Sequence, residues 1–213
     1  MDDHPVALDL VIHLNHDEVF RTLGYRDNAR RSARVERRLA ELWPSATDLL
    51  RPRGCYRVLD GARAATTGMP TPSAVVAAAL CTVGRELEEE SHRCSAAGNV
   101  LDALICDAIG SAAAESAADT LNAELCGIGR VAGLHATARV SPGYGEWETA
   151  RQGDFLALLP AAELGVSLTS GMMMVPRKSV SFAVNLNAGA RPDASSDFAC
   201  ERCGRPTCMY RRE

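Results

Sequence analysis

The sequence predicts an α+β fold built on a largely antiparallel sheet. Its 213 residues are 46% hydrophobic and 23% charged, which is typical of a globular protein. Helix-like and strand-like stretches are mixed without the regular alternation of a parallel α/β fold, and glycine and proline separate short strand-like runs. With no repeat or long linker, we expect one domain over residues 1–198 and a cysteine-containing tail over 199–213.

The first part of the chain predicts two strands and two helices. The aliphatic run at 6–14 (VALDLVIHL) predicts an opening strand, and Asn15 is a suitable N-cap for a short helix that Gly24 would end. A second helix is expected over 29–51. Residues 55–61 (CYRVLDG) have the length and composition of a strand closed by Asp-Gly.

The middle of the chain predicts a long alanine-rich helix. Residues 74–84 are almost wholly apolar, which fits a strand or a buried helix, and 85–98 predict a polar helix that Gly98 ends. A long helix follows over 99–125, capped by Asn99. Its apolar positions recur at three- and four-residue steps and share one face: Leu101, Ile105, Ala108 and Ala112.

Two carboxylates continue the apolar face of this helix. The same spacing leads to Glu115 and then to Asp119. An ionised group in line with an apolar face is unfavourable unless it has a partner. Two interpretations stay open: a structural salt bridge to one of the arginines, or contact with a cationic group of a ligand.

The remainder of the predicted domain consists of short elements. Residues 131–140 are strand-like, and 148–160 predict a helix stopped by Pro160. Three short strands are expected in the runs GVSLT, MMMV and SVSFAVNL, which Gly171 and the segment PRK separate. The consecutive methionines at 172–174 are interpreted as core-filling residues.

The segment RVSPGYGEWE, residues 139–148, predicts a sharp turn with ligand-binding groups. Arg139 offers a planar guanidinium with five donors, and Pro142 and Gly143 permit a tight bend. Tyr144 adds an aromatic face and a hydroxyl. Taken alone, the segment is either a structural turn or a site where backbone amides and side chains hold a ligand.

The composition argues against nucleic-acid and membrane partners. The net charge is −4, and the arginines of residues 26–42 alternate with acidic residues, which is typical of a solvated helix face. No stretch of about 18 uncharged apolar residues could span a bilayer, and the first residues lack the basic region of a secretory signal. We therefore expect a cytoplasmic protein.

The tail contains a cysteine cluster. Cys200, Cys203 and Cys208 have the spacing C-x2-C-x4-C, which can bind zinc or an iron–sulfur cluster. The fourth ligand would be Cys55 or another distant cysteine, an exogenous ligand or a group of a second subunit. A redox dithiol and inert cysteines are the alternatives. The cysteines within apolar runs are expected to act as small hydrophobic residues: Cys81, Cys94, Cys106 and Cys126.

Three segments, in order, carry a resemblance to a known family. Residues 139–145 (RVSPGYG) resemble the R-x-x-P-G-Y motif of the activation domain of cobalamin-dependent methionine synthase, which binds S-adenosylmethionine (AdoMet). Residues 165–182 are similar to its G-x-x-L-T-x-x-x-x-M-x-P-x-x-S-V-S segment, and 107–119 are similar to its acidic helix. The resemblance covers residues 99–198, and the part before residue 70 is similar to small stand-alone relatives.

This resemblance implies a C-shaped unit around a twisted antiparallel sheet, with AdoMet along its inner surface. It implies that Arg139 contacts the AdoMet carboxylate and that Glu115 meets the amino group. The backbone at Ser141 and Gly143 and the ring of Tyr144 would line the site.

The resemblance also implies an activity. The family domain remethylates cobalamin that has been oxidised to the cob(II) form, with one electron from flavodoxin or a similar reductase and the methyl group from AdoMet. Two features depart from the pattern: Phe198 stands where the family has an aromatic hydroxyl, and nothing resembles the D-x-H-x-x-G loop of a cobalamin domain.

We therefore expect an AdoMet-binding accessory protein that reactivates cobalamin in trans. Its partners would be a corrinoid protein or truncated methionine synthase and an electron donor such as flavodoxin or ferredoxin. An iron–sulfur cluster in the tail could relay electrons, whereas zinc would only fold the tail. The alternative is a non-catalytic AdoMet-sensing or metal-binding module that has kept the fold.

Overall fold

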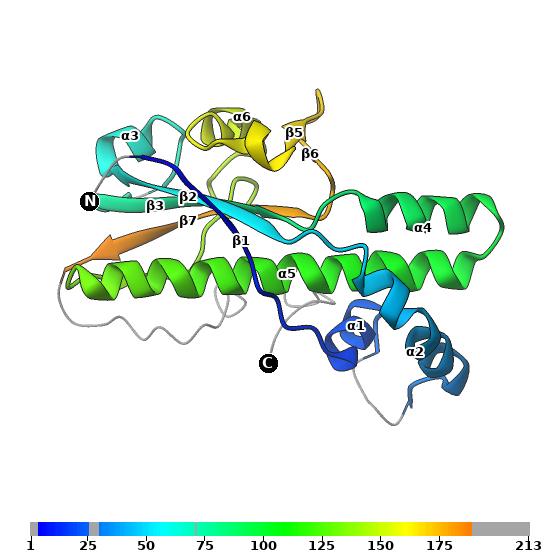
Figure 1. Cartoon of the computed structure of the whole chain (residues 1–213). Helices are drawn as coiled ribbons and strands as arrows, with labels where there is room; N and C mark the ends of the chain where they lie inside the picture. The colour runs from blue at the N-terminus through cyan, green and yellow to red at the C-terminus, as the bar shows by residue number, and fades with distance from the viewer. Residues whose placement is uncertain (1–3, 26–29, 71, 189–213) are drawn as a thin grey trace.

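A five-stranded antiparallel sheet forms the centre of the structure (Figure 1). The computed structural model describes residues 4–25, 30–70 and 72–188. Helices flank the sheet, so the predicted α+β fold is confirmed. In spatial order the strands, each antiparallel to its neighbours, are β1 (Val6–Asp9), β2 (Arg53–Asp60), β3 (Val75–Thr82), β7 (Ser179–Asn187) and β4 (His135–Ala136).

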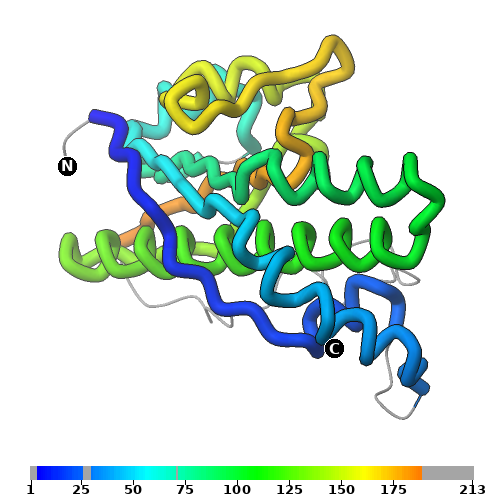
Figure 2. Tube along the Cα trace, turned by 45° about the vertical axis from the view of Figure 1, so that its right-hand side comes forward, coloured from blue at the N-terminus to red at the C-terminus, as the bar shows by residue number. Residues whose placement is uncertain are grey.

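Helix α5 (Val100–Val131) lies along one face of the sheet and organises that side of the molecule (Figure 1). Its 32 residues span about 48 Å at ~1.5 Å per residue. Neither α5 nor any other helix of the described residues is long and apolar enough to cross a membrane. Figure 2 shows the three helices that pack against α5: α1 (His16–Thr22), α2 (Ala33–Thr47) and α4 (Glu86–Ala96).

The central strands bury both of their faces. Along β3, Ala77 and Ala79 belong to the core on the α5 side, whereas Ala78 and Leu80 belong to a second core on the opposite side. Successive side chains of a strand point to opposite faces of the sheet. A strand that is covered on both faces is therefore apolar at every position and does not alternate between polar and apolar residues. The apolar run at 74–84 is therefore a strand, which settles the alternative left open by its composition.

Short elements cover the second face of the sheet (Figure 1). Trp147 and Phe155 form the centre of this core, with their rings edge to face and their centroids 5.2 Å apart. The surrounding elements are α3 (Gly61–Ala65), two 3₁₀ turns (Thr149–Arg151 and Ala161–Leu164), α6 (Gln152–Leu156) and the hairpin of β5 (Ser167–Leu168) and β6 (Met174–Val175).

Local signals at the ends of α1 are confirmed. The side chain of Asn15 accepts a hydrogen bond from the backbone N–H of Glu18 at 2.9 Å, as an N-cap does. Gly24 follows the last turn with a φ of 90°, a left-handed conformation that favours glycine. Asn99 lies at the N-cap position of α5 but makes no side-chain capping bond.

Several predicted elements differ from the structure. The opening strand predicted at 6–14 is shorter, because β1 ends at Asp9. Helix α5 continues past 125 to Val131, because Leu125 and Gly129 still face the core. The predicted strand at 131–140 shrinks to β4, followed by an isolated bridge between Val140 and Ala183.

The predicted helix at 148–160 also differs, because it divides into the 3₁₀ turn Thr149–Arg151 and the short helix α6.

One of the three methionines packs against the core. Met174 is half-buried and contacts the second core, whereas Met172 is half-buried in the turn and Met173 is 57% exposed, so the interpretation of this run as core filler holds for Met174 and is wrong for Met173. Met172 has a φ of 62° in the turn between β5 and β6, where its backbone N–H donates to the carbonyl of Thr169.

Candidate functional site

Helix α5 and the segment after β4 bring three charged side chains together. Glu115 and Asp119 lie one turn apart on α5. The Nη2 atom of Arg139 lies 2.9 Å from Oδ1 of Asp119 and 3.8 Å from Oε2 of Glu115. The predicted salt bridge to an arginine is therefore confirmed. We call Glu115, Asp119 and Arg139 the charged cluster.

The charged cluster lies at the boundary between core and solvent. The side chain of Arg139 is only 9% exposed, whereas those of Glu115 and Asp119 are each 51% exposed. The carboxylates can therefore reach solvent, whereas the Arg139 side chain is almost fully enclosed by the protein. The two carboxylates therefore keep part of their hydration, whereas the guanidinium has lost most of its contact with water and depends on partners within the protein.

Pairing with β7 explains why Arg139 points at α5. Val140 and Ala183 exchange two backbone hydrogen bonds, of 2.9 and 2.8 Å. Val140 packs on the second core, so the preceding residue faces the α5 side. There the guanidinium carbon of Arg139 lies 5.4 Å from the centroid of the buried Phe182 ring, within the range of a cation–π contact.

The adjoining turn, residues 141–147, is closed by its own backbone. The N–H of Gly143 donates to the carbonyl of Trp147 at 2.6 Å, and the N–H of Tyr144 donates to Ser141 at 3.1 Å. Gly143 has a φ of 93°, and a Cβ atom there would lie 3.0 Å from Oγ1 of Thr149. These two amide donors serve the turn itself.

Trp147 anchors the turn in the second core. Its ring is 1% exposed, and its Nε1–H donates to the carbonyl of Thr67 at 2.9 Å. Sequence reasoning did not identify Trp147, although tryptophan occurs only twice in the chain and this one directly follows the PGYGE run. Its neighbour in the turn, Tyr144, is 73% exposed. The turn therefore holds one aromatic ring inside and presents another to solvent.

A second ion pair joins α5 to the start of β7. Lys178, the only lysine of the chain, places Nζ 2.7 Å from Oδ1 of Asp107 and donates to the hydroxyl of Ser111 at 2.7 Å. Its aliphatic stem crosses Gly110, where a Cβ atom would lie 3.2 Å from Cγ of Lys178. A glycine at this position lets the lysine lie close against the helix.

The three family-like segments therefore meet in space. The segments at 107–119 and 139–145 join through the charged cluster, and the segment at 165–182 contributes both Phe182 and Lys178. Segments that are far apart in the sequence but carry matching motifs make direct contacts. This is the arrangement expected of one shared site.

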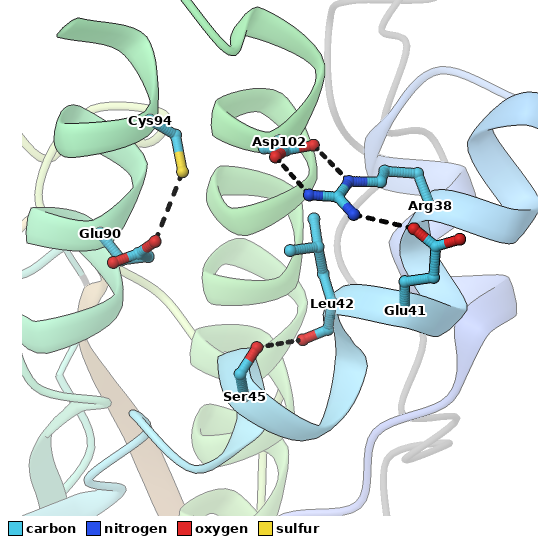
Figure 3. Close-up of polar contacts among 7 residues, drawn as sticks. All are labelled: Arg38, Glu41, Leu42, Ser45, Glu90, Cys94 and Asp102. Atoms are coloured by element: carbon cyan, nitrogen blue, oxygen red, sulfur yellow. Dashed lines mark hydrogen bonds and ion pairs between the residues drawn. The ribbon is translucent and has the colours of Figure 1, made fainter. Parts of the chain in front are cut away.

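The arginine-rich helix α2 makes a structural contact away from this site (Figure 3). Arg38 donates to both carboxylate oxygens of Asp102, at 2.7 Å each, and to Glu41 at 2.8 Å. The Arg38 guanidinium holds the pKa of the Asp102 carboxyl below its usual range. A cavity of about 720 Å³ opens between α2 and the first turn of α5, beside this ion pair.

Three of the cysteines in the described residues, Cys55, Cys81 and Cys106, are buried in the core. Burial raises the pKa of Cys55 and of Cys81 to about 12, and it raises that of Cys106 to about 11. Cys94 and Cys126 are half-buried.

The predicted metal ligands Cys200, Cys203 and Cys208 lie outside the described residues, as does Phe198. Within residues 4–25, 30–70 and 72–188, no group of three or more histidine, cysteine, aspartate or glutamate side chains could hold a metal ion. The metal-binding prediction for the tail stays a prediction.

Comparison with known proteins identifies the fold. No protein-family model and no curated protein sequence matches the chain. Among solved structures, the chain is similar to the MetH reactivation domain bound to AdoHcy (S-adenosylhomocysteine), with a TM-score of 0.60 and 14% sequence identity. The match covers 89% of this chain and 80% of that one. The resemblance that the three motifs indicated is confirmed at the level of the fold.

Proposed function

We propose that this chain binds AdoMet, with the amino-acid end of the ligand at the charged cluster. The observation that carries the proposal is the meeting of a guanidinium with two half-exposed carboxylates, 2.9 and 3.8 Å away. A free amino acid group carries a carboxylate and an ammonium side by side, and this cluster offers a partner for each. The fold of a domain that was solved with AdoHcy adds support.

The roles of the residues follow from their positions. Arg139 would hold the ligand carboxylate, because a guanidinium has a fork of five donors and can serve Asp119 and a second acceptor. Glu115 would accept from the ligand ammonium. Tyr144 would offer its exposed ring to the nucleoside.

The turn at 141–147 would shape the wall of the site, and its backbone N–H groups would not serve as hydrogen-bond donors to the ligand. The N–H of Gly143 is directed to Trp147, so we expect Gly143 to contribute close approach of the backbone to the ligand. Ser141 is half-buried between Arg139 and the turn, and its carbonyl accepts from Tyr144. Ser141 and Gly143 would thus form the wall of the site.

AdoMet at this position would supply a methyl group to cobalamin. The proposed activity is reductive remethylation in trans: one electron reduces cob(II)alamin on a separate methionine synthase or other corrinoid protein, and the methyl group leaves AdoMet as AdoHcy forms. Flavodoxin or ferredoxin would donate the electron. Tyr144, in the segment at 139–145, and Met173, in the segment at 165–182, have exposed side chains that provide apolar surface.

Titration calorimetry with AdoMet tests the binding step. We expect saturable binding, and Arg139→Ala should weaken it by about tenfold or more, the scale of a lost charge-assisted hydrogen bond. Arg130→Ala is the matched control, because Arg130 lies in the last turn of α5 and is exposed. Absence of wild-type binding at millimolar AdoMet would refute the proposed function.

A second candidate is a non-catalytic AdoMet-sensing module. The sequence supports it, because nothing in the chain resembles the D-x-H-x-x-G loop of a cobalamin domain. The two candidates separate in an anaerobic mixture of the protein, cob(II)alamin on a corrinoid protein, reduced flavodoxin and AdoMet. Appearance of the methylcobalamin absorption spectrum supports remethylation, and binding without that spectrum supports sensing.

A further inference from the structure

The cavity between α2 and the first turn of α5 has the size of a small-molecule site. Its volume is about 720 Å³, and such sites usually measure roughly 300 to 1,000 Å³. Val35 of α2 and Leu101 of α5 line the cavity and are half-buried, and Val100, which also lines it, is 60% exposed. The cavity therefore offers apolar surface to an organic ligand.

The charged side chains of this cavity divide into a paired set and an unpaired set. Arg38 donates to both carboxylate oxygens of Asp102 and to Glu41, so its guanidinium is held in place (Figure 3). Arg34 and Arg37 also line the cavity and are exposed, but they make no hydrogen bond or ion pair with any described residue. Three guanidinium groups thus face two carboxylates, and the lining is positive in a chain whose net charge is −4.

The two unpaired arginines are placed to act together. Arg34 and Arg37 lie three residues apart on α2, so their side chains are neighbours on one side of the helix. Each guanidinium is a planar fork that matches two oxygens of a phosphate group. The two phosphate groups of a diphosphate present such oxygens side by side, so a single diphosphate can engage both forks.

We propose that this cavity binds a small organic molecule that carries a diphosphate. Arg34 and Arg37 hold the phosphate groups, and Val35, Val100 and Leu101 contact the organic part. The cavity is separate from the proposed AdoMet site, because the charged cluster begins about 20 Å further along α5, at ~1.5 Å per residue. Binding here would add a second ligand to the protein.

Titration calorimetry of the full chain with pyrophosphate at low salt tests the phosphate site. We expect saturable binding with a dissociation constant below about 1 mM. Arg34→Gln and Arg37→Gln should each weaken it about three- to tenfold, the scale of a charge-assisted hydrogen bond at an exposed site. The double variant should lose measurable binding. Failure of pyrophosphate to bind wild type would overturn the inference.

The organic part is tested with ADP, which joins a diphosphate to a nucleoside. Val100→Ser should weaken ADP but leave pyrophosphate unchanged, because it removes apolar surface and no charge. An unchanged ADP affinity would overturn the role of the apolar wall.

Arg130→Gln is the charge-matched control, because Arg130 is exposed in the last turn of α5, at the far end of the helix from the cavity. It should leave the pyrophosphate affinity within about twofold of wild type. An equal loss in Arg130→Gln and Arg34→Gln would mean that only overall charge matters, which would overturn the site. Circular dichroism establishes that each variant is folded.

A peptide of glutamates tests the alternative occupant, an acidic segment of a partner protein. If this peptide binds through Arg34 and Arg37 and pyrophosphate does not, the surface is a protein-docking face and the small-molecule site is overturned. AdoMet should bind the double variant as it binds wild type. Failure of the diphosphate site therefore leaves the proposed function standing, and failure of AdoMet to bind leaves the diphosphate site standing.

Discussion

Trp147 is the residue whose replacement should reveal how strongly the turn at 141–147 depends on the second core. Trp147→Phe keeps an aromatic ring but removes the indole N–H, which donates to the carbonyl of Thr67 at 2.9 Å. It also leaves a void, because the site is fully enclosed and the ring is 1% exposed. Both losses lower the free energy of unfolding.

The magnitude follows from these two losses. A void of roughly 40 Å³, at ~24 cal/mol per Å³, costs about 1 kcal/mol. Loss of the hydrogen bond costs about 1 kcal/mol more, because the Thr67 carbonyl loses its partner. The sum of about 2 kcal/mol should lower the melting temperature by roughly 4–8 °C for a chain of this size.

Urea denaturation followed by far-UV circular dichroism measures the change without relying on tryptophan fluorescence. Trp43→Phe is the matched control, because Trp43 is half-buried on α2 and makes an edge contact with His16 at a centroid distance of 4.3 Å. We expect it to cost less than about 1 kcal/mol. A change below about 0.5 kcal/mol for Trp147→Phe, or an equal cost for both variants, would refute the anchoring role.

Two further predictions concern α5. The Arg38 guanidinium depresses the pKa of Asp102 in the folded protein. The ion pair therefore stabilises the fold at any pH above the unfolded-state pKa of about 4, and this stabilisation is lost as the pH falls through the folded-state pKa. The stability gap between wild type and Asp102→Asn, measured by urea denaturation, should therefore shrink between about pH 5 and pH 3; a constant gap would contradict this reasoning. Gly110→Leu should lower the free energy of unfolding by about 1–3 kcal/mol in the same assay, because the leucine side chain meets the stem of Lys178. Gly110→Ala adds only a Cβ atom against this flexible stem, so its free energy of unfolding should stay within about 1 kcal/mol of wild type. Equal costs for the two glycine variants would show that the space above Gly110 is not limiting.

Features that depend on neighbouring residues were predictable from the sequence. The cap at Asn15 and the end of α1 near Gly24 follow from side-chain chemistry within one turn of helix. The alanine-rich helix and its alignment of Glu115 with Asp119 follow from the 3.6-residue period. Motif similarity added the order of three segments, from which the fold was inferred, and the fold was confirmed.

Features that depend on distant partners were not predictable in this way. The stretch at 131–140 looked like a strand, but its length depends on pairing with the edge of β7 that is not bonded to β3. That pairing is limited to the two residues of β4 and the bridge between Val140 and Ala183. Met173 was interpreted as a core residue, but its side chain is 57% exposed in the short hairpin of β5 and β6.

The sequence by itself determined the elements, the long helix and the candidate ligand groups, because periodicity, caps and turn residues act over a few positions. Only the tertiary structure decided that Arg139 is the partner of Asp119 and Glu115 and that Trp147 holds the turn in place. The physical reason is that a salt bridge across 20 residues, or a ring buried against a carbonyl 80 residues away, depends on how the sheet and α5 pack.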